Sequence, residues 1–223
     1  MLEFWQPFWL SLRLAAATTV VLAALGLPLA YWLAFGRGRL RTLAHARVSL
    51  PLVLPPTVLG FYLLLLLSPA GTVGSFLDRA LGLRLVFSFW GLVIGSVLFS
   101  LPFMVQPIES ALLALPPSLA EAAYVLGKAR WQTFWRVLLP NVRHAAFSGA
   151  VMTFAHTVGE FGVVLMLGGS IPGQTRTAAI AIYSEVEAMD YAGAHRHAFV
   201  LLFCALLLLA ALEHWRRRER ETA

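Results

Sequence analysis

Two ionisable side chains, His156 and Glu160, stand one helical turn apart in the apolar segment Ala145–Leu167, which carries no other ionisable group. A carboxylate in such a segment is costly, and it indicates a gate, a pathway lining or a proton relay. Gly159 and Gly162 flank the carboxylate and loosen the backbone there. The simpler interpretation is structural: an ion pair, or a hydrogen bond that holds the glycine-loosened helix, with His156 as the partner of Glu160. Because a carboxylate repels anions, we do not expect Glu160 to bind one directly.

A second polar group lies downstream in the stretch GGSIPGQTRT, where Gly and Pro indicate irregular backbone. Its hydroxyls, including that of Thr175, and the guanidinium of Arg176 would suit the reception of an anion or contact with a partner protein. The same stretch is equally compatible with an ordinary connector.

The sequence lacks the groups that catalysis, metal binding or nucleotide binding would need. A P-loop requires G-x-x-x-x-G-K-[ST]. The nearest candidate, Gly127-Lys128, has Ala122 where the first Gly should be and Ala129 where Ser or Thr should be. The lone cysteine, Cys204, excludes an internal disulfide and a multi-cysteine metal site. We therefore expect no catalytic residue, metal or cofactor on this chain, and any ATP with its Mg²⁺ belongs to another subunit.

The elements that must position these residues are membrane-spanning helices. Of the 223 residues, 59% are hydrophobic and only 13% are charged, whereas a soluble domain carries about 25% charged residues. Helices that span a bilayer need roughly 17–25 apolar residues. The first such run is too long for a signal peptide, and its basic cluster follows it. Five spans are predicted, at about residues 10–36, 48–68, 85–108, 144–167 and 194–213.

Lysine and arginine residues fall mainly on one side of these spans. Twelve of the seventeen lie in the short linker 37–47, the segment 128–143 and the tail 216–223. The positive-inside rule places these in the cytoplasm, with the C-terminus, and places the N-terminus outside. Basic residues that flank spans contact lipid headgroups, so the net charge of +6 does not indicate nucleic-acid binding. The predicted domains are a transmembrane domain, 1–215, and a basic cytoplasmic tail, 216–223.

The cytoplasmic loop 117–140 has helical signals of its own. Ser118 followed by Glu121 has the spacing of a capping box, which starts a helix. Gly127 supplies the left-handed residue that ends one. A second helix, about Trp131–Leu138, is expected to stop at Pro140. The loop is therefore predicted to fold as a short helix, a tight corner and a second short helix.

Three signals concern the remaining segments. The external loop Ser68–Arg84 is expected to hold one or two helical turns after the turn-rich SPAGTVG. The external segment Gly168–Ala194 is expected to hold a short interfacial helix that presents one apolar side: Ile180, Tyr183 and Val186. Three prolines are expected to bend the second span or delay its start: Pro51, Pro55 and Pro56.

The spacing within the cytoplasmic loop resembles the EAA motif of ABC importer permeases. The matching positions are Glu121, Ala122, Ala123, Gly127, Leu139 and Pro140. Val137 stands where the family commonly has Ile, a minor departure. In that family the first helix is a coupling helix that docks on the cytoplasmic ATPase subunit, and the resemblance implies the same role here. The simpler alternative is that Glu121 only caps its helix and Gly127 only ends it, and both roles can hold together.

Two flanking stretches, HTVGEFGVVLMLGGSIPGQTRTAAIAIYSEVE and LPFMVQPIESALLALPPSLAEAA, resemble molybdate permeases, close relatives of the sulfate and tungstate permeases. The resemblance covers about Val48–Phe203. It implies an all-α integral membrane protein with the type I ABC importer permease fold, in the bacterial cytoplasmic membrane. It also implies a permease homodimer that works with an ATPase homodimer and an extracytoplasmic molybdate-binding protein. The expected function is ATP-driven import of molybdate by alternating access.

Other functions stay open at this point. A permease for sulfate, thiosulfate or tungstate is the alternative in substrate. A proton-coupled secondary transporter that uses His156 and Glu160 is an alternative of another class. A membrane anchor without a pathway is a third, although the Gly- and Pro-rich spans give it no support.

Overall fold

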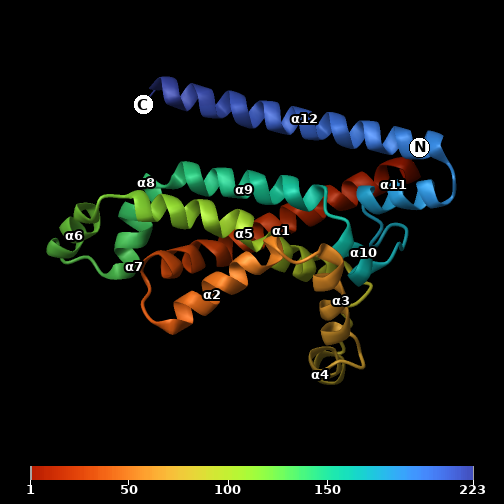
Figure 1. Ribbon diagram of the computed structural model, residues 1–223, viewed down its shortest axis with the longest axis horizontal. Coiled ribbons are helices and arrows are strands. Elements are labelled where there is room, and N and C mark those ends of the chain that lie inside the picture. Colours follow the sequence, from red (N-terminus) through yellow and green to blue (C-terminus); the bar gives the residue numbers. More distant parts are fainter. Residues whose placement is uncertain (1, 223) are drawn as a thin grey trace. The chain divides into compact units, whose positions relative to one another are not determined.

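The computed structural model describes the backbone of residues 2–222 and the side chains of residues 3–211. Every regular element in that range is a helix (Figure 1), which confirms the predicted all-α class. The side chains of the predicted basic tail, 216–223, lie outside the described residues. The chain divides into two compact units: unit 1, Met1–Ala17, Pro55–Ser96 and Phe154–Ala223, and unit 2, Thr18–Leu54 and Val97–Thr153.

Several of the described helices have the length and composition needed to cross a membrane. Three are long and apolar enough to cross a bilayer: α1 (Leu2–Phe35), α5 (Phe89–Ala114) and α12 (Tyr191–Thr222). Two bent helix pairs raise the number of possible spans to five if each pair counts as one. The described residues therefore allow the five predicted spans.

The first bent pair joins α2 (Arg39–Ser49) and the 3-10 turn η1 (Leu50–Leu52) to α3 (Pro56–Leu67). The break falls at the predicted prolines, since Pro55 is the N-cap of α3 and Pro56 its first residue. Proline suits a helix start because its missing N–H has no partner there in any case. No helix was predicted for the basic linker 37–47, yet most of it is helix α2.

The core of unit 2 forms where α1 and α5 meet the segment that precedes α9 (Arg143–Val158). Its buried side chains include Leu22, Leu33, Met104, Ile108, Phe134 and Leu138. Helix α2 is fixed to α5 by polar contacts, since His45 Nε2 lies 3.2 Å from Glu109 Oε2 and the Gln106 amide donates to Ser49 Oγ at 3.2 Å. This explains why α5 continues past the predicted end at residue 108: Glu109 is buried against a partner instead of ending the span.

In unit 1, α3 packs closely on α10 (Gly162–Gly168) through small residues. A Cβ at Gly60 would lie 2.8 Å from Met166 Cβ, so the two backbones approach as only glycine allows. The loop after α3, predicted to be external, forms α4 (Thr72–Leu81), which ends at left-handed Gly82.

The short helix predicted in the segment 168–194 is α11 (Ala178–Glu187). Its start is fixed to α1 because Ser11 Oγ accepts a hydrogen bond from the Ala178 N–H at 2.9 Å. Its predicted apolar side is only partly correct. Ile180 is buried, whereas Tyr183 and Val186 are exposed. The buried side of α11 instead includes Ala178 and Ala181, whose small side chains let the helix lie close to its neighbours.

Candidate functional site

The loop 117–140, predicted to be cytoplasmic, begins with helix α6 (Pro117–Val125), which starts two residues earlier than the predicted capping box requires. Pro116 is the N-cap, and no side chain caps the helix. Because Pro117 occupies the first helical position, Ser118 already lies inside the first turn and cannot cap it. The predicted Ser118–Glu121 capping box is therefore wrong, and the Glu121 side chain is exposed.

The corner after α6 has the predicted left-handed residue, since Gly127 has a φ of +74°. The Lys128 N–H donates to Ala123 O at 3.0 Å and the Gly127 N–H donates to Tyr124 O at 2.9 Å, which satisfies carbonyl groups at the helix end. A Cβ at Gly127 would meet no atom within 4 Å, so only the backbone conformation requires glycine there. Ala123 is buried under the corner, whereas Ala122 is exposed.

The second half of the loop is α7 (Arg130–Thr133), the π-helical turn η2 (Phe134–Leu138) and α8 (Leu139–Asn141). The prediction that the helix stops at Pro140 is wrong, because Leu139 and Pro140 begin α8 and the chain turns only at Val142 before α9. The wider π turn accommodates a proline that has no N–H to donate to a preceding carbonyl. Phe134 and Leu138 of this turn are fully or almost fully buried in the unit 2 core, which anchors the loop.

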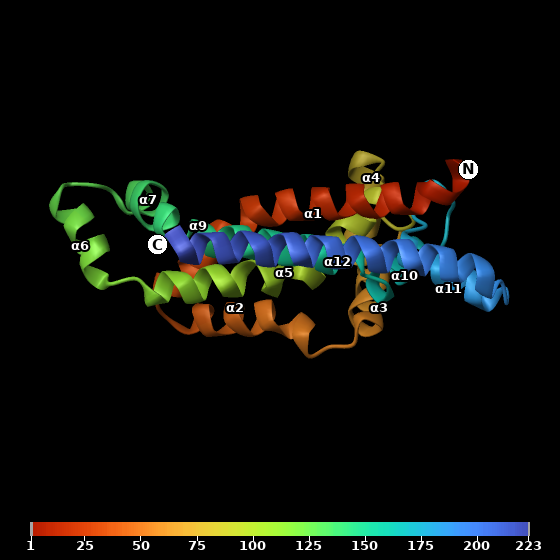
Figure 2. The same ribbon diagram turned by 90° about the horizontal axis from the view of Figure 1, so that it is seen from above.

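The tip of the loop presents apolar side chains to solvent. In unit 2, α6 and α7 extend beyond the nearer ends of α5 and α9 (Figures 1 and 2). Val125 is 88% exposed and Leu126 is 77% exposed. Trp131 and Trp135 are also exposed, with ring centroids 5.3 Å apart. Exposed apolar clusters of this kind mark contact sites for another protein.

Glu160 lies at the break between α9 and α10, where the backbone leaves the helix. Both of its carboxylate oxygens are buried, and among the described residues only the Ser96 hydroxyl is near enough to interact with them, without the geometry of a full hydrogen bond. The predicted hydrogen bond with His156, which is half-buried, is therefore not formed. Gly162 next to it has a packing role, because a Cβ there would lie 2.7 Å from Pro56 Cβ, whereas Gly159 has more room. Whether these residues line a pathway or gate stays a prediction.

The external candidates Thr175 and Arg176 differ in their surroundings. Thr175 is fully buried, and its hydroxyl donates to Gly168 O at 2.6 Å and accepts from the Ile171 N–H at 3.1 Å. These bonds close the irregular turn, so the Thr175 hydroxyl has no capacity left for an anion. Arg176 is half-buried, and its Nε has no hydrogen-bond partner among the described residues.

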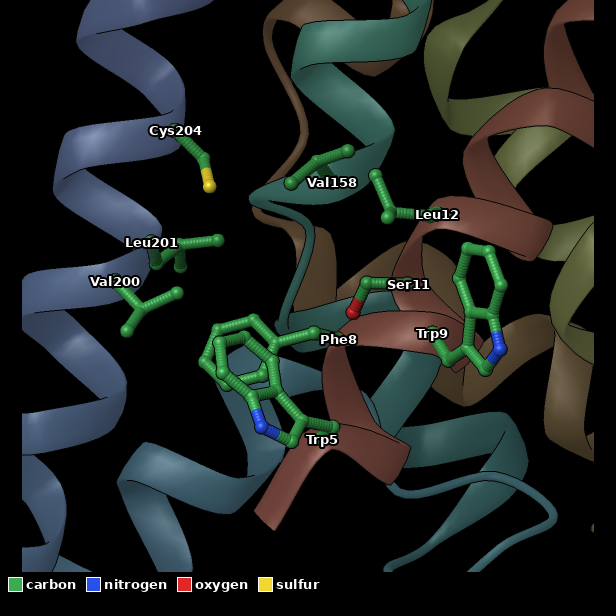
Figure 3. A pocket seen from close by; sticks show the side chains of 9 residues that line it. All are labelled: Trp5, Phe8, Trp9, Ser11, Leu12, Val158, Val200, Leu201 and Cys204. Carbon is green, nitrogen blue, oxygen red and sulfur yellow. The ribbon is translucent and has the colours of Figure 1, made fainter. Parts of the chain in front are cut away.

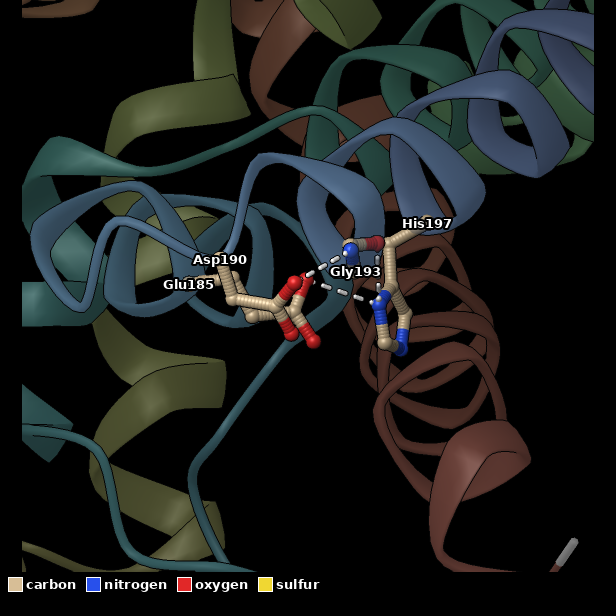
Figure 4. Close-up of polar contacts among 4 residues, drawn as sticks. All are labelled: Glu185, Asp190, Gly193 and His197. Carbon is tan, nitrogen blue, oxygen red and sulfur yellow. Dashed lines mark hydrogen bonds and ion pairs between the residues drawn. The ribbon is translucent and has the colours of Figure 1, made fainter.

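A polar cluster that the sequence did not indicate joins α11 to α12 (Figure 4). His197 Nδ1 lies 2.9 Å from Glu185 Oε2, and the Gly193 N–H donates to Asp190 Oδ1 at 2.9 Å. His197 is buried under Phe4 and Phe8 of α1, with ring centroids 4.4 and 5.4 Å away. These contacts fix the direction in which α12 leaves α11.

A cavity of about 330 Å³ lies in unit 1, lined by α1, α12 and Val158 (Figure 3). Trp5 and Phe8 border it on α1, and Leu201 and Cys204 border it on α12. Ser11 is the only hydroxyl among its lining residues, and that group already bonds to Ala178. Such apolar walls do not suit an anion.

Comparisons with known proteins decide the family. Residues 26–218 match the family described as "binding-protein-dependent transport system inner membrane component". The chain belongs to this family. This inner-membrane component is 50% identical over 209 residues to the molybdenum transport system permease protein ModB of Azotobacter vinelandii, covering 93% of this chain and 92% of the relative. It is 32% identical to ModB of Escherichia coli (strain K12), over 98% and 96% of the two chains. It is also 36% identical to the sulfate transport system permease protein CysT of Synechococcus elongatus, over 77% and 62%.

Solved structures show the fold of this inner-membrane component. A chain of a bacterial ABC transporter involved in the import of alginate aligns with a TM-score of 0.79 at 21% identity, over 97% of this chain and 79% of that one. A chain of the MetNI methionine ABC transporter, crystallised in inward-facing conformations, aligns with a TM-score of 0.74 at 18% identity, over 98% and 96%. The fold is that of type I ABC importer permeases, as the sequence predicted.

Proposed function

We propose that this chain is the membrane subunit of an ATP-driven importer that carries molybdate into the cytoplasm by alternating access. The observation that supports this most directly is the α6–α8 loop. It combines a buried anchor, Phe134 and Leu138, with an exposed apolar tip, Val125 and Leu126. The chain that carries this loop is 50% identical over 209 residues to a molybdenum transport permease.

Import of a dianion needs an energy source. Moving one elementary charge against 100 mV costs about 2.3 kcal/mol, hence about 4.6 kcal/mol for molybdate entering against an inside-negative potential. A passive channel would conduct in the wrong direction. This chain has no P-loop, so the energy comes from ATP and Mg²⁺ bound to a cytoplasmic ATPase homodimer.

The loop transmits that energy to the membrane helices. Only Leu115 and Pro116 separate α6 from α5, and η2 and α8 lead directly toward α9. When ATP draws the two ATPase subunits together, the α6 helices that they hold move with them. The attached spans then change from inward-facing to outward-facing access.

The full assembly contains further partners. Two copies of this permease enclose the pathway about a twofold axis, and an extracytoplasmic molybdate-binding protein delivers the anion. The charge distribution supports an N-terminus outside and a C-terminus in the cytoplasm of the bacterial inner membrane. The similarity to a sulfate permease supports sulfate as the second candidate substrate.

Gly127 tests this function together with a matched control, Gly82. Both glycines follow a helix, have a positive φ and would meet no atom within 4 Å on gaining a Cβ. A β-branched residue strains both backbones, because both have a φ in the left-handed region. In proteoliposomes with the ATPase and binding protein, Gly127→Val should reduce molybdate uptake per ATP hydrolysed by about tenfold, because about 1–2 kcal/mol of strain misplaces α6. Gly82→Val, in the external loop, should leave this ratio unchanged.

Two outcomes would contradict the proposal. Equal coupling in both variants would show that the α6 corner transmits nothing to the pathway. Molybdate uptake that continues without ATP but stops when a protonophore collapses the proton gradient would instead support a proton-coupled transporter that uses Glu160.

A further inference from the structure

A second cavity in unit 1, of about 690 Å³, differs from the apolar one because a cation borders it. Three segments form its walls: α1 with Leu10 and Arg13, the start of α5 with residues 87–90, and the external turn at Gly173 and Gln174. The start of α5 and the turn at Gly173 and Gln174 lie on the side of the membrane that the charge pattern predicts to be outside. No aspartate or glutamate lines this cavity.

Arg13 is an exposed side chain that contacts an aromatic ring and no carboxylate among the described residues. Its guanidinium carbon lies 5.5 Å from the centroid of the Phe89 ring, a cation–π contact that orients the planar group. No ion pair joins Arg13 to a carboxylate among the described residues, whereas Arg84 pairs with Asp78 at 3.2 Å. The edge of the guanidinium is therefore available for a planar pair of hydrogen bonds to an oxyanion.

The start of α5 adds donors to the same cavity. The Ser88 hydroxyl donates to Leu85 O at 2.7 Å and accepts from the Gly91 N–H at 3.2 Å, so it fixes the helix start and is itself occupied. Phe89 and Trp90 are the first residues of α5, and their N–H groups have no partner within the helix. Their partial positive charge adds to that of Arg13.

The wall before α5 is held in an unusual conformation. Phe87 has a φ of +59°, which is rare for a residue with a large side chain, and its N–H donates to Leu167 O at 2.8 Å. Residues kept in such conformations by their surroundings gather at binding and catalytic sites. The side-chain amide of Gln174, exposed on the opposite wall, supplies a further neutral donor.

We infer that this cavity is an entry site for a tetrahedral oxyanion, in which Arg13 binds the anion and Gln174 and the α5 N-terminus complete its hydrogen bonds. The inference deepens the proposed function and rests on it, since it names the place where the imported anion first contacts this chain. In the sequence Arg13 is only one of the five basic residues outside the predicted cytoplasmic segments, because nothing near it in the chain indicates the neighbours that the fold supplies.

The test compares Arg13→Gln with Arg79→Gln. Arg79 is an exposed arginine of the external helix α4, outside the cavity, so both variants remove the same charge from the same predicted side. Loss of a charge-assisted bond should raise the dissociation constant for radiolabelled molybdate about tenfold or more in Arg13→Gln, and Arg13→Lys should recover part of it. Arg79→Gln should bind like the unaltered chain. Binding is measured on the purified permease–ATPase complex in neutral detergent without the binding protein.

Each other outcome is decisive. Equal affinity in both variants, or no binding of molybdate, sulfate or phosphate by the unaltered complex, overturns the entry site even if the complex imports molybdate. Binding that depends on Arg13 in a complex that imports no molybdate keeps the site and rejects the proposed function. A phospholipid headgroup offers the same phosphate chemistry. If anionic lipid added in nanodiscs abolishes molybdate binding, and Arg13→Gln weakens only lipid retention, the site belongs to lipid and the inference is wrong.

Discussion

Gly162 is the more tightly packed of the two glycines that flank Glu160. Its neighbour Glu160 attracts attention in the sequence because it is charged, yet the glycine has the clearer structural role. The start of α10 approaches the start of α3 so closely that any side chain on Gly162 would overlap with Pro56. Such an approach stabilises the contact through many short-range attractions, and it tolerates no added volume.

Gly162→Ala should therefore destabilise the protein, and Gly159→Ala should not. A Cβ at Gly162 would lie 2.7 Å from Pro56 Cβ, whereas at Gly159 the nearest atoms are 3.9 Å away. Overpacking of this kind costs about 1–3 kcal/mol. Thermal unfolding of the two purified variants in the same detergent measures the difference. Equal unfolding temperatures would show that α10 can move away from α3 without cost.

Among the helices, α6 matters most for the proposed function, because its exposed end is the part that would contact the ATPase subunit. Leu126 immediately precedes the left-handed Gly127, and Leu81 of α4 immediately precedes the left-handed Gly82. The two leucines are similarly exposed, at 77% and 63%. Their helices are predicted to lie on opposite sides of the membrane.

Leu126→Asp should abolish copurification of the ATPase subunit, because a carboxylate at the tip of α6 would have to be desolvated in an apolar contact. Leu81→Asp should leave copurification intact. Both chains should reach the membrane in equal amounts, since neither leucine is buried. Retention of the ATPase by Leu126→Asp would place the docking surface elsewhere on the chain.

The sequence predicted these elements unevenly, for physical reasons. Gly127 and the prolines before α3 were placed correctly because a left-handed residue and a missing N–H act locally. Helix α2 was missed because its polar contacts with α5, such as that between His45 and Glu109, join residues that are far apart in the chain. The continuation of helix through Pro140 was missed because a π turn depends on the burial of Phe134 and Leu138. The Glu185–His197 cluster and the Arg13 cavity likewise exist only after folding.

At the scale of the whole molecule, the arrangement of charges predicts which loops face the cytoplasm. In a Cys204→Ser background, Arg130→Cys should react with a membrane-impermeant maleimide only after the membrane is permeabilised. Leu83→Cys, in the exposed segment after α4, should react in intact cells. The reverse pattern would reject the orientation and, with it, docking of the loop on a cytoplasmic ATPase.

The short connection between α5 and α6 has a mechanical consequence. Leu115 and Pro116 alone join the two helices, and the pyrrolidine ring of Pro116 allows almost no rotation about φ. A joint this short has no slack to absorb displacement. The distance by which nucleotide binding displaces α6 and the distance by which the adjoining end of α5 moves should therefore be nearly equal.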